Sequence, residues 1–337
     1  AIDQLNQVIK DDPTLVSAYD LLAQVIEQQS GNAAGTELYL TQAIEKNPTS
    51  AVAYIQRANY RIRSGKPQEA AEDLTQAGKC DLDKTDVKIL LAETWLKANH
   101  PEQTQAILQD VLSKEPANTS AWLLRARMVL AAGKSEQMVV IAEEGLKALG
   151  EDATDFLPIA AELFIQGQKT DRAKDCVDKL RQAQVNEVVL VYLEGVIAEK
   201  DKDWGHAARS FRKAYELGRK DEDTAIRTAN ALVQSGDILA ASTIISAYLN
   251  TQSESFRGQL LAGDLMARQR QWTLAMTHLR KALLLNPKSA EIGALILQTR
   301  LQRLSSASVS DDSWDMLIKD INQILQQQDS LSVRAML

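Results

Sequence analysis

The side chains that most often bind metals or act as nucleophiles are sparse in this sequence. Three histidines, His100, His206 and His278, lie far apart, and none has a second His, Cys or carboxylate at the i, i+4 spacing of a helical metal site. Two cysteines, Cys80 and Cys176, are also far apart, so they cannot form a disulfide framework or a metal knuckle. We expect both to be small buried apolar side chains, and we predict no metal site.

Motifs for phosphate binding or acyl transfer are missing as well. Neither G-x-x-x-x-G-K-[ST] nor G-x-S-x-G occurs, and Gly65-Lys66 precedes Pro67, which indicates a turn followed by a helix. Acidic pairs such as Asp11-Asp12 and Glu143-Glu144 are expected to cap helices or face solvent rather than act as general acids. The sequence therefore predicts no enzyme, no catalytic residues and no cofactor.

The composition is that of a folded helical protein. Of 337 residues, 45% are hydrophobic and 25% are charged, and only 15 are Gly and 7 are Pro. A net charge of −7 argues against a nucleic-acid partner, because phosphate binding needs a basic face. No stretch approaches the roughly 20 apolar residues that span a bilayer, so no membrane insertion is expected within this sequence.

The clearest organising feature is a repeat of 34 residues. Pro48, Leu82, Pro116 and Gly150 follow one another at this spacing. Inside the period, small and large residues recur in the same order, as in Gly195, Trp204, Ala207, Phe211 and Ala214 and again in Gly263, Trp272, Ala275, Leu279 and Ala282. Spacings of four and seven keep these residues on one helical face, which predicts two amphipathic helices in each repeat.

The positions of the small residues predict how the two helices meet. The eighth position of each repeat is small, which allows a close approach, and it is occupied by Ala23, Ala58, Ala92, Ala126, Ala160, Gly195, Ala229 and Gly263. Ala70, Ala207, Ala241 and Ala275 serve the same purpose on the second helix. Gly65, Gly133, Gly167 and Gly236 are expected to end first helices in the left-handed conformation.

These residues resemble the tetratricopeptide repeat family, whose pattern is W-x2-L-G-x2-Y, then A-x3-F-x2-A, then P. Trp122, Tyr19, Tyr54 and Phe156 occupy the Trp place, and Ala207, Phe211 and Ala214 match the second-helix residues. Pro13, Pro48, Pro116 and Pro287 match the terminal Pro. The resemblance implies an all-α solenoid, a right-handed superhelix of antiparallel helix pairs.

The repeats predict the organisation of the chain. Residues 1–15 form the second helix of a truncated repeat, residues 16–289 form eight tandem repeats, and residues 290–337 form an irregular ninth. The eight repeats start at about Val16, Ala51, Thr85, Thr119, Ala153, Val188, Glu222 and Phe256. The fifth is expected to carry insertions around residues 169–173 and 182–187, and the ninth a Ser- and Asp-rich insertion at 305–313 before an amphipathic helix that begins near Trp314. Both ends resemble cuts through a solenoid, so we expect a fragment of a longer repeat protein.

In the family, first helices line a concave groove, and the fifth and ninth positions of each repeat point into it. The fifth-position candidates for partner binding are apolar: Ile55, Ile89, Leu123, Leu157, Tyr192, Ile226 and Leu260. The ninth-position candidates are polar: Asn59, Glu93, Arg127, Asn230 and Asp264. They predict a polar-edged apolar channel for a partner helix or extended peptide. The alternative is that the apolar residues pack against neighbouring first helices.

The groove lacks one family specialisation. Repeats that hold acidic chaperone tails use Lys at the fifth position with Asn at the ninth, whereas here Ile55 and Ile226 accompany Asn59 and Asn230. The sequence therefore predicts a scaffold or adaptor for other partner proteins, in an assembly of the bacterial envelope, of secretion or of polysaccharide export. The alternative is a regulatory or recruiting module of a larger enzyme, such as a glycosyltransferase, whose catalytic domain lies outside these residues.

Overall fold

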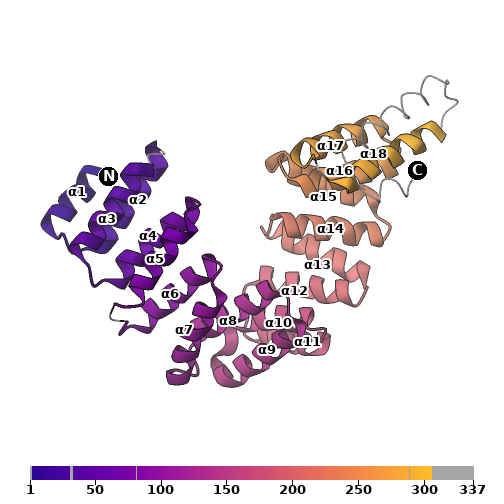
Figure 1. The fold of residues 1–337 in the computed structure, drawn as a ribbon. Helices are drawn as coiled ribbons and strands as arrows, with labels where there is room; N and C mark the ends of the chain where they lie inside the picture. Colours follow the sequence, from indigo (N-terminus) through magenta and orange to yellow (C-terminus); the bar gives the residue numbers. More distant parts are fainter. Residues whose placement is uncertain (1, 31–32, 81, 288, 306–337) are drawn as a thin grey trace. The chain divides into compact units, whose positions relative to one another are not determined.

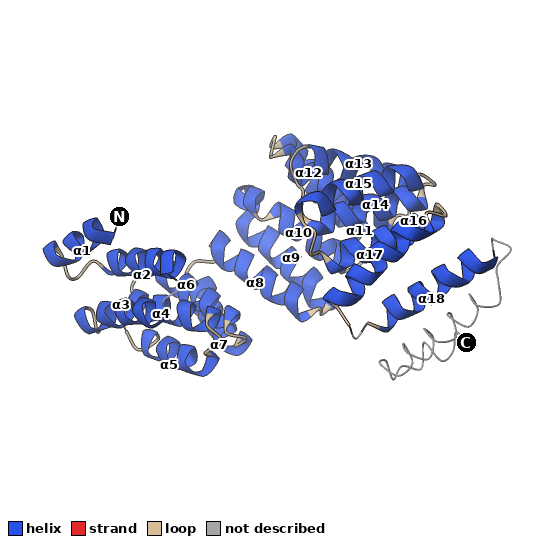
Figure 2. Cartoon of the chain, turned by 90° about the horizontal axis from the view of Figure 1, so that it is seen from above, coloured by secondary structure: helices blue, strands red, loops and turns tan. Residues whose placement is uncertain are grey.

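The computed structural model describes residues 2–30, 33–80, 82–287 and 289–305, and within these residues every regular element is a helix (Figure 2). The chain divides into two compact bodies, Ala1–Lys169 and Thr170–Leu337, which we call the N-terminal and C-terminal bodies. The all-helical fold expected from the repeat is confirmed. The helix expected near Trp314 lies outside the described residues.

The N-terminal body consists of successive antiparallel helix pairs, in which first and second helices alternate (Figure 1). Its helices are α1 (Ile2–Asp11), α2 (Val16–Ser30), α3 (Ala33–Lys46), α4 (Ala51–Arg63), α5 (Pro67–Ala77), α6 (Thr85–Lys97), α7 (Pro101–Lys114), α8 (Thr119–Ala132), α9 (Ser135–Leu149), the 3-10 turn η1 (Gly150–Asp155) and α10 (Leu157–Gln166). Each first helix from α4 to α8 packs against its own second helix, the preceding second helix and the neighbouring first helices.

The C-terminal body continues the alternation. Its helices are α11 (Thr170–Gln182), α12 (Glu187–Lys200), α13 (Trp204–Glu216), α14 (Glu222–Gln234), α15 (Ile238–Thr251), α16 (Phe256–Arg268), α17 (Trp272–Leu285) and α18 (Ala290–Ser305). Here α11, α13, α15 and α17 are second helices, and each packs against the first helix that follows it.

The two helices of a pair meet where a small residue faces a large one. A Cβ built on Gly195 of α12 would lie 2.7 Å from Cδ1 of Phe211 on α13, and one on Gly263 of α16 would lie 2.5 Å from Cδ2 of Leu279. Such distances leave no space for a methyl group. The small eighth position is therefore required by the large residue that the second helix places over it.

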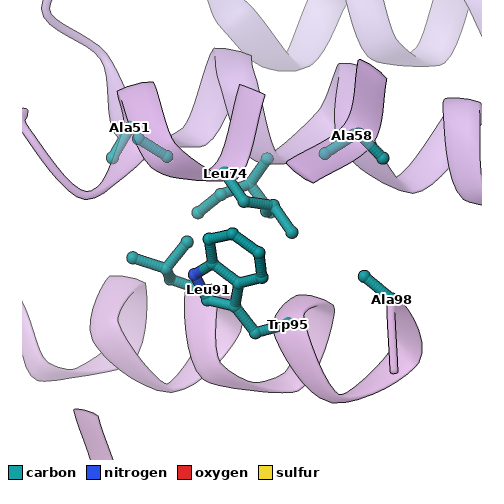
Figure 3. Close-up of a cluster of buried hydrophobic side chains, with 9 residues drawn as sticks. Ala51, Ala58, Leu74, Leu91, Trp95 and Ala98 are labelled. Atoms are coloured by element: carbon teal, nitrogen blue, oxygen red, sulfur yellow. The ribbon is translucent and has the colours of Figure 1, made fainter. Parts of the chain in front are cut away.

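Between repeats, larger side chains fill the core. In the cluster around α4, α5 and α6, the indole of Trp95 points toward Leu74, and Ala51 and Ala58 lie on the helix opposite (Figure 3). Leu91 completes the contact from α6. A repeat buries its apolar face against its neighbour, as expected for stacked helix pairs.

The turn between first and second helices has a fixed backbone geometry. In each described turn, from α4–α5 to α16–α17, one residue with positive φ lies two residues before the second helix begins, and these residues are Gly65, Asn99, Gly133, Gln168, Lys202, Gly236 and Arg270. The prediction is confirmed for Gly65, Gly133 and Gly236 and wrong for Gly167, whose φ is −77°. Gly167 is needed for space instead, because a Cβ there would lie 2.4 Å from Cγ2 of Val139.

The same turns locate the irregularity of the fifth repeat. They are spaced by 34 residues except between Gly133 and Gln168, where the spacing is 35. The extra length lies in η1, between α9 and α10, and not around residues 169–173 and 182–187 as expected from the sequence. Aligned on the turn, Leu157 and not Phe156 corresponds to Trp122, so the register predicted for this repeat was off by one residue.

The contact between α4 and α5 includes buried charges. Asp73 of α5 is buried and accepts hydrogen bonds from Arg57 at 2.6 and 3.0 Å and from Arg61 at 2.9 Å, both on α4. Arg61 also pairs with Glu37 of α3 at 2.9 Å. Arg57 occupies the position at which the family pattern has Leu. A charged side chain therefore lies between the helices, and the carboxylates of Asp73 and Glu37 compensate its charge.

Replacing Ala207 with Leu should overpack the contact between α12 and α13. The side chain of Ala207 is fully buried, so we expect a loss of about 1–3 kcal/mol in the free energy of unfolding. Ala247→Leu on the exposed side of α15 is the matched control and should change stability little. Chemical denaturation measures both, and equal midpoints for the two variants would show that the assigned helix faces are wrong.

Replacing Lys202 or Arg270 with Gly should stabilise the protein. These residues have φ values of 60° and 59°, which cost a residue with a Cβ about 1 kcal/mol relative to Gly. Lys220→Gly, at an exposed turn residue without positive φ, should be neutral or destabilising, because it only adds freedom to the unfolded chain. A rise in melting temperature for Lys220→Gly as large as for Lys202→Gly would contradict this account.

Candidate protein-binding surface

The residues predicted to bind a partner all lie on first helices. In the N-terminal body α4, α6, α8 and α10 pack side by side, and in the C-terminal body α14 packs against α16. We call the face that carries the fifth and ninth positions of these helices the first-helix surface of each body.

Most of the apolar candidates are core residues. Ile55, Ile89, Leu157 and Ile226 are only 0%, 8%, 5% and 6% exposed. Ile55 packs in the cluster with Leu74 and Trp95, and Ile89 packs with Leu108 and Leu124. These four side chains therefore pack against neighbouring helices, which was the alternative to a role in partner binding.

Three apolar candidates remain partly accessible. Leu123 on α8, Tyr192 on α12 and Leu260 on α16 are half-buried. The corrected register of the fifth repeat puts half-buried Pro158 at the fifth place and explains why Leu157 is buried. A partner could contact the first-helix surface at these side chains without opening the core.

The polar candidates of the N-terminal body differ in how far they are already bonded. Asn59 donates hydrogen bonds to the carbonyl oxygen of Ile55 at 3.1 Å and to Oγ1 of Thr94 at 3.3 Å, which ties α4 to α6. Glu93 is half-buried and Arg127 is exposed, and neither forms an ion pair within the described part of the chain. These two charges are available to a partner.

In the C-terminal body, polar groups near Tyr192 bond to one another. The hydroxyl of Tyr192 donates to Oδ2 of Asp223 at 2.5 Å, and the guanidinium carbon of Arg219 lies 3.4 Å from the centre of the Tyr192 ring. Burial, with the hydrogen bond to Asp223, raises the pKa of Tyr192 far above its usual value. Arg227 pairs with Asp223 and with Glu199, which joins α12 to α14.

This network was not identified from the sequence. Asp223 and Arg227 have the i, i+4 spacing of a helical ion pair, which was the available signal. Their link to Tyr192 depends on two repeats stacking, so spacing alone does not reveal it. Of the other candidates in this body, Asp264 pairs with Arg268 at 2.7 Å, and Asn230 is exposed.

The groups with potential for chemistry remain dispersed. Within the described residues, no three His, Cys, Asp or Glu side chains are placed to hold a metal ion. Nδ1 of His278 lies 2.8 Å from Oε1 of Gln259, and burial lowers its pKa. Cys176 is buried as expected, whereas Cys80 is only half-buried, so the prediction for Cys80 was wrong.

Comparison with known proteins supports the repeat assignment. A tetratricopeptide repeat family model matches residues 61–128. A search of curated proteins gave no match. Among solved structures, a chain of the APC/C hetero-tetramer Cut9–Hcn1 aligns with a TM-score of 0.56 and 15% identity over 88% of this chain and 58% of that chain. This chain therefore spans less than two thirds of that relative.

Two shorter structures are similar as well. A tetratricopeptide repeat protein from Parabacteroides merdae has a TM-score of 0.55 and 17% identity over 74% of this chain and 98% of that chain. PilW, a type IV pilus biogenesis factor, has a TM-score of 0.56 and 16% identity over 63% of this chain and 98% of that chain. At these identities the likeness concerns the fold.

The fold defines a class of protein, a solenoid of stacked helix pairs. Residues 61–128 match the tetratricopeptide repeat family, and the described part of the chain has the fold of tetratricopeptide repeat structures. This fold supports protein–protein interaction in general. In the described part of the chain, no helix combines the length and the apolar character that crossing a membrane requires.

Leu157→Glu and Leu123→Glu should differ in their effect on stability. Leu157 is buried, so an unpaired carboxylate there should cost several kcal/mol and unfold its repeat. Leu123 is half-buried at the surface, so a Glu side chain can reach water and the loss should be small. Thermal unfolding followed by circular dichroism distinguishes the two, and equal destabilisation would show that Leu123 is also a core residue.

Proposed function

We propose that this protein is a scaffold that holds a segment of a partner protein across the first-helix surface of its N-terminal body, centred on α6 and α8. The observation that supports this location is the exposed guanidinium of Arg127, which forms no ion pair in the described part of the chain, one turn from half-buried Leu123. In the C-terminal body, Tyr192 occupies the position that corresponds to Leu123. It is hydrogen-bonded to Asp223, which pairs with Arg227, so these groups already bind one another.

The chemistry of these side chains indicates what the segment offers. Arg127 can form a charge-assisted hydrogen bond with a carboxylate of the partner. Leu123 can contact an apolar side chain one turn away from that carboxylate. Glu93, on the neighbouring helix α6, adds a negative charge that would repel a second acidic group placed there.

For the setting, we propose an assembly of the bacterial envelope, of secretion or of polysaccharide export. Abundant Gln and Ala support it, and so does the likeness in fold to PilW, a pilus biogenesis factor. The alternative, a recruiting module of a larger enzyme such as a glycosyltransferase, would use the same surface. A photo-crosslinking amino acid at exposed Ala131, one turn after Arg127 on α8, distinguishes them in cells and leaves Arg127 in place. An adduct with another assembly component supports the scaffold, and one with a catalytic domain supports the alternative.

Arg127→Glu and Leu123→Glu should abolish partner capture while the melting temperature stays near that of the original protein. Charge reversal at Arg127 repels the partner carboxylate, and Leu123→Glu removes the apolar contact. Capture is measured by pull-down of the cross-linked partner, with Val140→Glu on α9 as the control, because Val140 is an exposed apolar residue of the same repeat. Unchanged capture by both variants would remove this surface from consideration.

A further inference from the structure

A pocket of about 420 Å³ lies in the C-terminal body between α11, α12 and the start of α13. Its floor is apolar and is formed by the buried side chains of Val177, Ile197 and Ala198. The α12 residues that line it are not the fifth and ninth positions of the repeat, so the pocket is separate from the first-helix surface.

The two ends of the pocket have similar charges. At one end, Arg181 donates to Asp178 at 2.5 Å and to Glu194 at 2.7 Å, so one cation serves two carboxylates. At the other end, Lys174 pairs with Asp201 at 2.9 Å, and Asp203 adds a second carboxylate. Counted over these acidic and basic side chains, each end has one more carboxylate than it has cations.

The distance between the ends follows from the helix. Lys174 and Arg181 are seven residues apart on α11, which corresponds to about 10 Å along its axis. Asp203 contributes one oxygen to the backbone N–H of His206 at 3.0 Å as the cap of α13. The side chain is therefore held in place while its charge still acts on the pocket.

We propose that this pocket binds a linear segment of a partner protein that carries two basic side chains about 10 Å apart. Two cations at that spacing would each meet one excess carboxylate, and the residues between them would cover the apolar floor. In polyproline II conformation, residues i and i+3 lie on the same side about 9 Å apart, so an Arg-x-x-Arg segment fits. The net charge of −7 favours approach of such a partner.

The probe is the synthetic peptide Ala-Arg-Pro-Pro-Arg-Ala, blocked at both ends and titrated into the whole chain by calorimetry. Two control peptides replace both Arg by Gln or place the two Arg next to each other. We expect the first peptide to bind about tenfold more tightly than the adjacent-Arg peptide. Its affinity should fall with added salt, because the charges are partly exposed.

Variants locate the site. Asp178→Asn and Asp203→Asn each remove one charge, and Asn still caps a helix at position 203, so both should fold and the double variant should lose about tenfold in affinity. Asp175→Asn is the control. Asp175 pairs with Arg172 on the same helix, as Asp178 does with Arg181, but it does not line the pocket.

Four outcomes would overturn the proposal. Equal weakening by Asp175→Asn would show general attraction to an acidic surface. Equal binding of the adjacent-Arg peptide would show that the spacing is not recognised. Equal binding of a diamine with amines about 9 Å apart would show that the pocket needs no peptide. A double variant that binds the peptide like the original chain would place the peptide elsewhere.

Discussion

The helix pairs of this protein depend on one contact, in which a small residue of the first helix receives a large residue of the second. Gly195 against Phe211 and Gly263 against Leu279 leave no space for even one added methyl group. This close approach fixes the distance between the helices of a pair, and it thereby orients the faces that stack on the next repeat. The turns with positive φ join the two helices of a pair, and the core around Trp95 lies between one pair and the next.

The close approach also decides which residues remain for binding. When helices pack this tightly, a large apolar residue on the side of a first helix reaches the neighbouring helix, as Ile55 and Ile89 do. Only side chains that point away from the neighbouring helices stay accessible to solvent, as Leu123 and Arg127 do. The surface available to a partner is therefore narrower and more polar than a list of apolar positions indicates.

Charged side chains distinguish repeats that share one backbone. Around Asp73, two arginines replace apolar packing between α4 and α5. Around Tyr192, similar groups join α12 to α14 across the first-helix surface. Arg127 also lies on a first helix, and within the described residues it has no such partner. A common fold thus presents bonded charges in one place and available charges in another, which gives a scaffold different binding properties along its length.

Sequence alone determined the repeat, the helix faces and most turns, because small and large residues recur at fixed local spacings that depend on one helix pair at a time. Gly65 and Gly133 illustrate this. The roles of Leu157 and Gly167 could be assigned only from the tertiary structure. The extra length in η1 shifts the register at Leu157, and Val139 from another helix limits the space at Gly167. The burial of Ile55 and the bonds of Tyr192 were likewise decided by stacking, since each depends on residues one repeat away.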